Sequence, residues 1–203
     1  MMSRPDPSAA AALVEAGRFF NHRGWVPATG GNFSTRATNG NVAITASGCH
    51  KGELTEADII LADLDGRSLD PKRKSSYETL LHCQVYKRLP ECGAVLHTHS
   101  VANTVLSRRL DKVNLAGYEL LKVLDGIATH DVTVTIPVFA NDQDIARLAA
   151  AVDAQMQAGN ARHGYLIRGH GLYAWGPTLA VARHRVEALE FMFECEMRSA
   201  YQS

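Results

Sequence analysis

An apolar run that ends in two alternating histidines, Gly93-Ala94-Val95-Leu96-His97-Thr98-His99-Ser100, organises this chain. The small and aliphatic residues at its start predict a buried β-strand. Side chains two positions apart on a strand point to the same face, with Cα atoms roughly 7 Å apart. His97 and His99 can therefore bind one metal ion together. An isolated pair of this kind is also typical of polar strand ends that make ordinary hydrogen bonds.

A third histidine follows much later, between glycines. His170 lies in Arg168-Gly169-His170-Gly171, where the glycines let the backbone turn and leave space around the ring. Three neutral imidazoles with one open coordination position are typical of a catalytic zinc site rather than a closed structural one. The sequence thus makes His97, His99 and His170 candidate ligands of one metal ion.

The segments on either side of this strand alternate between helical and strand patterns. Asn39-Gly40 between two strand-like runs is typical of a tight hairpin turn, and Ser75 or Ser76 can cap a helix. Hairpins mixed with helix and strand alternation indicate one layered α/β domain over residues 1–203, with helices covering a sheet. Helices are predicted for residues 8–23, 77–88, 100–110, 118–123, 142–157 and 178–201, and strands for 32–38, 41–46, 59–62, 93–96, 132–138 and 165–168.

Composition excludes several classes of protein. Of the 203 residues 46% are hydrophobic, which is enough for a substantial core, and 21 Lys and Arg balance 21 Asp and Glu. No stretch concentrates positive charge, so we expect no nucleic-acid partner. No run approaches the roughly 20 apolar residues that cross a bilayer, and the N-terminus lacks the apolar stretch of a secretory signal. We therefore expect a soluble, cytoplasmic protein without a membrane partner, and reduced thiols on its four cysteines.

Three loops rich in glycine and hydroxyl groups are candidates for binding a phosphate. Exposed backbone N–H groups, hydroxyl donors and the start of a helix all favour an anion, although each loop alone is also typical of an ordinary turn. The P-loop and GxGxxG fingerprints are absent, which removes the main support for a nucleotide cofactor. The loops are Gly30-Gly31-Asn32-Phe33-Ser34, Thr45-Ala46-Ser47-Gly48 and Lys74-Ser75-Ser76.

Two glutamates are candidate proton carriers. Glu78 lies in the first turn of a predicted helix, where a carboxylate often serves only to complement the helix dipole. Glu119 stands among apolar neighbours and either faces solvent or lies near the metal. A carboxylate close to a Lewis-acidic metal would be the natural acid or base for chemistry next to a carbonyl.

Five segments in this order resemble the class II sugar-phosphate aldolase and epimerase family, and the resemblance covers nearly the whole chain. The family resemblance implies a three-layer α/β/α sandwich with a central, mainly antiparallel sheet. The segments are Gly31-Asn32-Phe33-Ser34, Thr45-Ala46-Ser47-Gly48, Ser76-Tyr77-Glu78, Ala94-Val95-Leu96-His97-Thr98-His99-Ser100 and Gly169-His170-Gly171-Leu172.

The resemblance also implies a site and an assembly. It assigns one zinc ion per subunit to the three histidines already named, and a homotetramer with active sites near subunit interfaces. It assigns contacts with the phosphate of a small sugar-phosphate substrate to the loops around Asn32, Ser47-Gly48 and Ser76. Tyr77 departs from the aldolase pattern, which has a second serine there.

Three further segments, 117–122, 136–145 and 170–176, look most like the dehydratases of this family. The resemblance therefore implies a hydro-lyase acting on a ketose phosphate, with Glu119 on the position of the dehydratases' acid/base. The alternative is an aldolase or epimerase on another short sugar phosphate, such as fuculose or ribulose phosphate, in which Glu78 matters more than Glu119. A non-enzymatic adaptor with the same fold would be expected to have lost its metal ligands, and here all three histidines are present.

Overall fold

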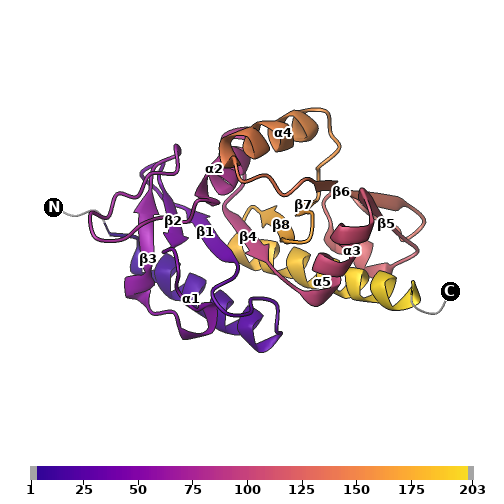
Figure 1. Ribbon diagram of the computed structural model, residues 1–203, viewed down its shortest axis with the longest axis horizontal. Coiled ribbons are helices and arrows are strands. Elements are labelled where there is room, and N and C mark those ends of the chain that lie inside the picture. The colour runs from indigo at the N-terminus through magenta and orange to yellow at the C-terminus, as the bar shows by residue number, and fades with distance from the viewer. Residues whose placement is uncertain (1–3, 201–203) are drawn as a thin grey trace.

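The computed structural model describes residues 4–200. Its centre is an eight-stranded sheet in the order β3-β2-β1-β4-β8-β7-β6-β5 (Figure 1). All neighbouring strands are antiparallel except β6 and β7, which are parallel. The strands are β1 (Asn32–Arg36), β2 (Val42–Thr45), β3 (Ile59–Ala62), β4 (Ala94–Thr98), β5 (Lys112–Ala116), β6 (Thr133–Phe139), β7 (Tyr165–Ile167) and β8 (Gly171–Gly176).

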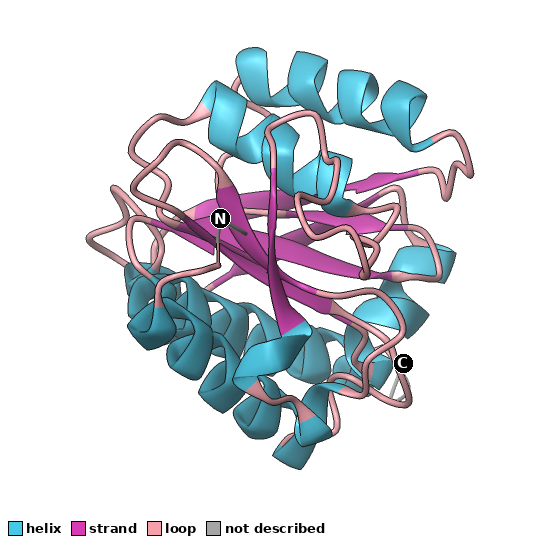
Figure 2. Ribbon diagram, turned by 90° about the vertical axis from the view of Figure 1, so that its left-hand side faces the viewer, coloured by secondary structure: helices cyan, strands magenta, loops and turns pink. Residues whose placement is uncertain are grey.

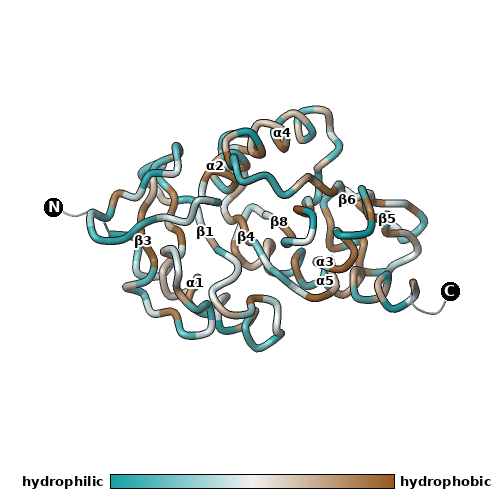
Figure 3. The backbone as a smooth tube through the Cα atoms, in the orientation of Figure 1, coloured by the Kyte–Doolittle hydropathy of each residue, from teal (hydrophilic) through white to brown (hydrophobic). Residues whose placement is uncertain are grey.

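Helices cover both faces of the sheet, as Figure 2 shows. One apolar core joins the sheet to α1, α3 and α5, and a second core joins the other face to α2 and α4. In Figure 3 the hydrophobic stretches lie mainly within strands and helices, and most connecting loops are hydrophilic. The predicted three-layer α/β/α sandwich with a mainly antiparallel sheet is confirmed. The helices are α1 (Pro7–His22), α2 (Thr79–Arg88), α3 (Val101–Arg109), α4 (Ile145–Gln157) and α5 (Leu179–Ser199), with short 3-10 turns η1 (Lys51–Glu53), η2 (Glu56–Asp58) and η3 (Glu119–Val123).

Strand direction decides which loops meet. Asn32 at the start of β1 pairs with His97 near the end of β4, and Thr98 pairs with Leu172 at the start of β8. The turn between β7 and β8, which carries His170, therefore lies at the same end of the sheet. We call this end, defined by Asn32, His97, His99 and His170, the histidine end.

The edge strand β5 runs the other way and ends at the opposite end of the sheet. It is antiparallel to β6, which is parallel to β7, so that Ala116 at its end pairs with Thr133 at the start of β6. Four inter-strand spacings separate β5 from β4, which amounts to about 19 Å across the sheet. The segment that follows β5 is thus remote from the histidine end both along the strands and across the sheet.

Most predicted elements are present, with differences at boundaries and at two strands. The sequence prediction missed β5 and β8. The prediction that Ser75 or Ser76 caps the helix at 77–88 is wrong. The helix begins at Thr79 with Glu78 as its N-cap residue. Ser76 lies two residues earlier, where its Oγ accepts a hydrogen bond from the Glu78 backbone N–H at 3.3 Å in the turn that leads into the helix. Residue 201 of the last predicted helix lies outside the described residues.

The cysteines and the apolar character of the helices were also considered in the sequence. All four cysteines are free thiols, as predicted. Within residues 4–200, no helix has the length and apolar character that crossing a membrane requires.

Candidate metal centre and active site

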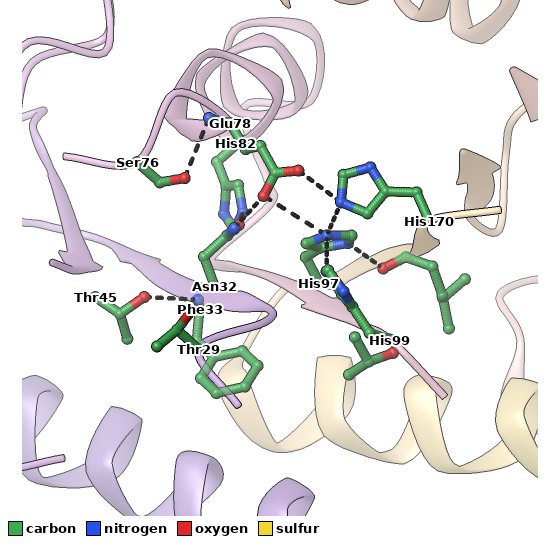
Figure 4. A network of polar contacts seen from close by, with 12 residues as sticks. Thr29, Asn32, Phe33, Thr45, Ser76, Glu78, His82, His97, His99 and His170 are labelled. Carbon is green, nitrogen blue, oxygen red and sulfur yellow. Dashed lines mark hydrogen bonds and ion pairs between the residues drawn. The ribbon is translucent and has the colours of Figure 1, made fainter. Parts of the chain in front are cut away.

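The three predicted histidines converge at the histidine end of the sheet (Figure 4). The His97 Nε2 lies 2.7 Å from the His99 Nε2 and 3.4 Å from the His170 Nε2. Their ligand atoms all lie within 4.8 Å of one another, and His97 is completely buried. This cluster, the histidine triad, can hold a metal ion.

The hydrogen bonding and charge of the triad fit a divalent metal. The His97 Nδ1 lies 2.9 Å from the Leu172 carbonyl oxygen, so it donates its proton there and the Nε2 keeps a free lone pair. Burial lowers the pKa of His97 well below its usual value and that of His99 to about 4. Both rings are therefore neutral at pH 7, the form that binds metals.

Glycine at position 171 makes the close approach of these rings possible. A Cβ added there would lie 2.2 Å from the Thr98 carbonyl oxygen and 2.8 Å from the His97 Cε1. The sequence predicted that the glycines beside His170 leave space around that ring, whereas the rings that Gly171 leaves room for are those of His97 and His99. Any larger residue at Gly171 would displace the triad.

The Glu78 carboxylate faces the triad from the start of α2. Its Oε1 lies 2.9 Å from the His170 Nε2, and its Oε2 lies 3.6 Å from the His97 Nε2 and accepts a hydrogen bond from the Asn32 Nδ2 at 2.5 Å. Burial on its own would raise the pKa of this carboxyl, but the neighbouring histidines and Asn32 outweigh that effect and hold the pKa well below its usual range. Glu78 is therefore an ionised carboxylate next to the candidate metal position.

A chain of buried hydrogen bonds orients Asn32 behind Glu78. The Asn32 Oδ1 is bonded to the His82 Nε2, and the His82 Nδ1 lies 2.7 Å from the Ser34 Oγ, which in turn lies 2.8 Å from the Tyr86 hydroxyl. Burial lowers the pKa of His82 to about 3, so the ring is neutral and donates from one nitrogen while it accepts at the other. The Asn32 amide is thereby fixed with its NH₂ group toward Glu78.

The other predicted phosphate residues lie in two adjacent loops. Ser47 donates its backbone N–H to the Lys74 carbonyl at 3.0 Å, and Ala46 forms an isolated bridge with Ser75. Ser47 and Gly48 are exposed, and Gly48 has a φ of 78°. A cavity of about 540 Å³ is lined by Ser47, Lys74, Ser75, Ser76 and Tyr77, among others. The structure thus brings Ser47 and Ser76 together around one open space.

Glu119, by contrast, does not approach the triad of its own chain. It begins η3, directly after β5, at the end of the sheet opposite to the triad. Its side chain is 70% exposed and contacts the Lys122 Nζ at 2.5 Å and the His130 Nδ1 at 3.1 Å. The hydrogen bond from Lys122 lowers its pKa. Within one chain, only Glu78 of the two candidate carboxylates is next to the histidines.

Glu190, which no sequence pattern singled out, supports the segment that carries His97 and His99. This residue of α5 is 2% exposed, and its carboxylate accepts hydrogen bonds from the Thr98 Oγ1 at 2.8 Å, the Asn103 Nδ2 at 2.9 Å and the Ser100 Oγ. Burial raises its pKa to about 7. A single buried carboxylate thus holds the side chains of both residues next to His99, Thr98 and Ser100.

A row of aromatic rings lies behind His97, and the last of them, Trp175, is tilted by 46° from its neighbour. Its imidazole stacks on the Tyr173 ring at 4.0 Å between centroids, and Tyr173 stacks on Tyr165 at 4.9 Å. Trp175 continues the row at 6.2 Å from Tyr165. Tyr173 and Trp175 are both buried core residues. The alternation Tyr173–Trp175 on β8 was a usable signal for a buried strand face.

Comparison with known proteins shows the family to which the chain belongs. Residues 11–197 match the family model described as the class II aldolase and adducin N-terminal domain. The chain belongs to this family. The solved structure of L-fuculose-1-phosphate aldolase from Thermus thermophilus superposes with a TM-score of 0.77 at 26% identity, covering 97% of this chain and 98% of that one. A second L-fuculose 1-phosphate aldolase, at 22% identity and a TM-score of 0.83, shares the fold.

Within the family, curated relatives with much higher identity carry one name. Methylthioribulose-1-phosphate dehydratase from Methylococcus capsulatus (strain Bath) is 55% identical over 190 residues, which are 93% of this chain and 93% of that protein. The protein of the same name from Pseudomonas fluorescens (strain Pf0-1) is 50% identical over 200 residues, covering 98% and 96%. The sequence-based assignment to the dehydratases of the class II aldolase family is confirmed.

Proposed function

We propose that this protein is a zinc-dependent methylthioribulose-1-phosphate dehydratase, which removes water from 5-methylthioribulose 1-phosphate to give 2,3-diketo-5-methylthiopentyl 1-phosphate in methionine salvage. The observation that carries the proposal is the buried triad with an ionised carboxylate beside it, in a chain whose relatives at 50–55% identity bear this name. His97, His99 and His170 would hold the metal. Three imidazoles with room for further ligands are the usual donor set of catalytic zinc.

A bound zinc ion would supply a Lewis acid that polarises the substrate carbonyl and makes the adjacent C3–H bond more acidic. Glu78 would accept the C3 proton, because its carboxylate is ionised and hydrogen-bonded in place by Asn32. The C4 hydroxyl then has to leave as water, which requires a proton from a general acid. The enol that remains becomes the 2,3-diketone when a proton is added at C4.

We propose Glu119 as that acid, acting in the site of a neighbouring subunit. The position of Glu119 at the other end of its own sheet supports a role in trans, and its exposed side chain is free to enter an interface. Burial between subunits would raise its pKa and favour the protonated form. This role fits a homotetramer with its active sites near the interfaces, in a cytoplasmic enzyme.

The phosphate of the substrate would lie between the loops of Asn32, Ser47-Gly48 and Ser76. The shared cavity at Ser47 and Ser76 supports this assignment, since it offers hydroxyl groups and backbone N–H groups to an anion. Asn32 has its side-chain amide engaged with Glu78, so it would contribute to phosphate binding through its backbone and by orienting the carboxylate.

A specific observation favours one alternative, an aldolase acting on a short sugar phosphate such as fuculose or ribulose phosphate. Glu78, on the aldolases' acid/base position, is the carboxylate next to the triad. Such an enzyme would break the C3–C4 bond rather than the bond from C4 to its hydroxyl.

Mass spectrometry of the products distinguishes the two reactions. The zinc-loaded protein is incubated with 5-methylthioribulose 1-phosphate, and we expect a product lighter than the substrate by one water. Dihydroxyacetone phosphate and methylthioacetaldehyde would instead establish carbon–carbon cleavage. Metal analysis of the purified protein tests the zinc assignment, and an equimolar content of another divalent metal would replace it.

A further inference from the structure

Lys51 is a buried lysine without a carboxylate partner. It lies in η1, is 2% exposed, and donates from its Nζ to the Thr29 carbonyl at 2.9 Å and the Cys49 carbonyl at 2.6 Å. Among the ion pairs within 4.0 Å in residues 4–200, none involves Lys51. The ammonium therefore has hydrogen bonds but no neutralising charge in direct contact.

Such an arrangement destabilises the protein by itself. Lysines are almost never fully buried unless they are paired with an opposite charge, because the ammonium loses its hydration. Burial accordingly lowers the pKa of Lys51, and two carbonyl dipoles compensate only part of the lost hydration. The Glu78 carboxylate raises the pKa of Lys51 only through its field, without direct contact. A buried cation that has no carboxylate in contact is a candidate for binding an anion.

The two carbonyls that Lys51 contacts identify the place. Thr29 directly precedes Gly30-Gly31-Asn32, and Cys49 directly follows Ser47-Gly48, so Lys51 connects two of the three proposed phosphate loops. A Cβ added at Gly30 would lie 3.1 Å from the His99 Nδ1, which puts the first of these loops against the triad. The Lys51 charge also contributes to the lowered pKa of His99.

The other cationic side chains near these loops are either paired with a carboxylate or exposed to solvent. Arg73 is neutralised by Asp58, with 2.6 Å between the Arg73 Nη1 and the Asp58 Oδ1. Lys72 and Lys74 are exposed, so solvent and salt screen their charges. Lys51 is the cation in this region that is both buried and free of a carboxylate contact.

We infer that Lys51 is the residue that makes these loops selective for a dianionic phosphate ester. Its hydrogen bonds to Thr29 and Cys49 fix the two loops, and its buried positive charge favours a dianion in the space between them. It is a positioning residue, since it acts through the loop backbones and through its field. The inference rests on the proposed function only in taking a phosphate ester as the substrate.

The test measures binding of inorganic phosphate by isothermal titration calorimetry, independently of turnover. Lys51→Met removes the charge and both hydrogen bonds, and Lys51→Gln removes the charge but keeps an NH₂ donor. Lys112→Met is the matched control, because it removes an exposed lysine of the edge strand β5, which is remote from these loops. We expect phosphate affinity to fall by about tenfold or more in both Lys51 variants and by less than about twofold in the control. Metal content and melting temperature, measured alongside, show whether each variant is folded.

Wild-type affinity for phosphate in the folded Lys51 variants would overturn the inference, as would a wild-type protein that does not bind phosphate. Full affinity in Lys51→Gln alone would overturn the role of the charge. If Lys51→Met does not fold, Lys51→Gln decides.

A second readout separates selectivity for phosphate from general damage to the site. We expect Lys51→Gln to raise KM for the phosphorylated ketose with little change in kcat, and to keep whatever activity the wild-type protein has on the unphosphorylated ketose. An equal loss on both substrates would indicate a structural role and overturn the inference. Failure of the proposed function would look different, because no product lighter by one water would form although phosphate still binds.

Discussion

The two ends of the sheet hold two glutamates in opposite conditions. At the histidine end, Glu78 is enclosed by His97, His170 and Asn32, with 16% of its side chain exposed. At the other end, Glu119 is 70% exposed, and its ion pairs within residues 4–200 are with Lys122 and His130 on the same surface. The first carboxylate is oriented by the folded chain before any ligand arrives, and the second can act only where another molecule approaches it. A site that uses both is completed by assembly.

The largest expected effect is loss of the triad. His97→Ala or His170→Ala removes one of three ligands, and we expect the protein to lose bound metal and at least about a thousandfold in kcat/KM. Metal is measured by mass spectrometry of the desalted protein, and turnover by loss of water from the substrate. His184→Ala, which changes a histidine of α5 away from the triad, is the control and should keep both. Stoichiometric metal in the triad variants would reject this centre.

Glu78→Gln tests the enclosed carboxylate. The amide keeps the shape of the side chain but cannot accept a proton, so we expect kcat to fall by roughly a hundredfold to ten-thousandfold while the metal content is retained. The effect should lie in kcat rather than in KM, because the residue acts on the reacting carbon. Turnover within a few-fold of wild type would show that the folded chain has not placed its base at Glu78.

Glu119→Gln tests the exposed carboxylate, and mixed assemblies test its placement. Alone, the variant should lose about a hundredfold in kcat and keep its metal. When co-assembled with His97→Ala subunits, up to about a quarter of sites regain both an intact triad and an intact Glu119, so activity should return. Asp131→Asn, which alters another exposed carboxylate beside His130, should behave like wild type. Mixtures that stay inactive would contradict a role in trans.

The smallest effect concerns stability at the histidine end. The pKa of Glu190 is raised to about 7 in the folded protein, above its ordinary value of 4.5, so the folded state binds more protons between these two pH values. The Glu190 contribution therefore favours folding below pH 4.5 and is progressively lost, by up to about 3 kcal/mol, as the pH rises through 7. Glu190→Gln should flatten this part of the stability profile, measured by urea unfolding from pH 5 to 8. An unchanged slope would assign the pH dependence to other groups.

Prediction from sequence succeeded where local patterns carry the information. Alternating His97 and His99 after an apolar strand, and the glycines around His170, predicted residues that the fold brings within 4.8 Å. The family resemblance likewise predicted the three-layer architecture. β5 was missed because its exposed and buried residues alternate over only Lys112–Ala116, directly after a helix.

Contacts across long separations in the chain could not be predicted. Glu190 meets Ser100 across 90 residues, and Lys51 meets Thr29 across 22, and neither residue belongs to a recognisable motif. The positions of the two glutamates relative to the triad could not be predicted either. Both lie in segments that resemble the class II aldolase family, and only the direction of β5 in the sheet shows that they lie at different ends. Strand direction is a property of the assembled sheet, and single segments do not encode it.

The row of rings behind His97 also makes tryptophan fluorescence a probe of the histidine triad. One of the two tryptophans of the chain, Trp175, is connected to the His97 imidazole through Tyr165 and Tyr173, with successive centroids 6.2, 4.9 and 4.0 Å apart. Its emission should therefore be quenched when a paramagnetic ion such as Cu²⁺ occupies the triad. Trp175 would then report metal occupancy of the triad without substrate or label.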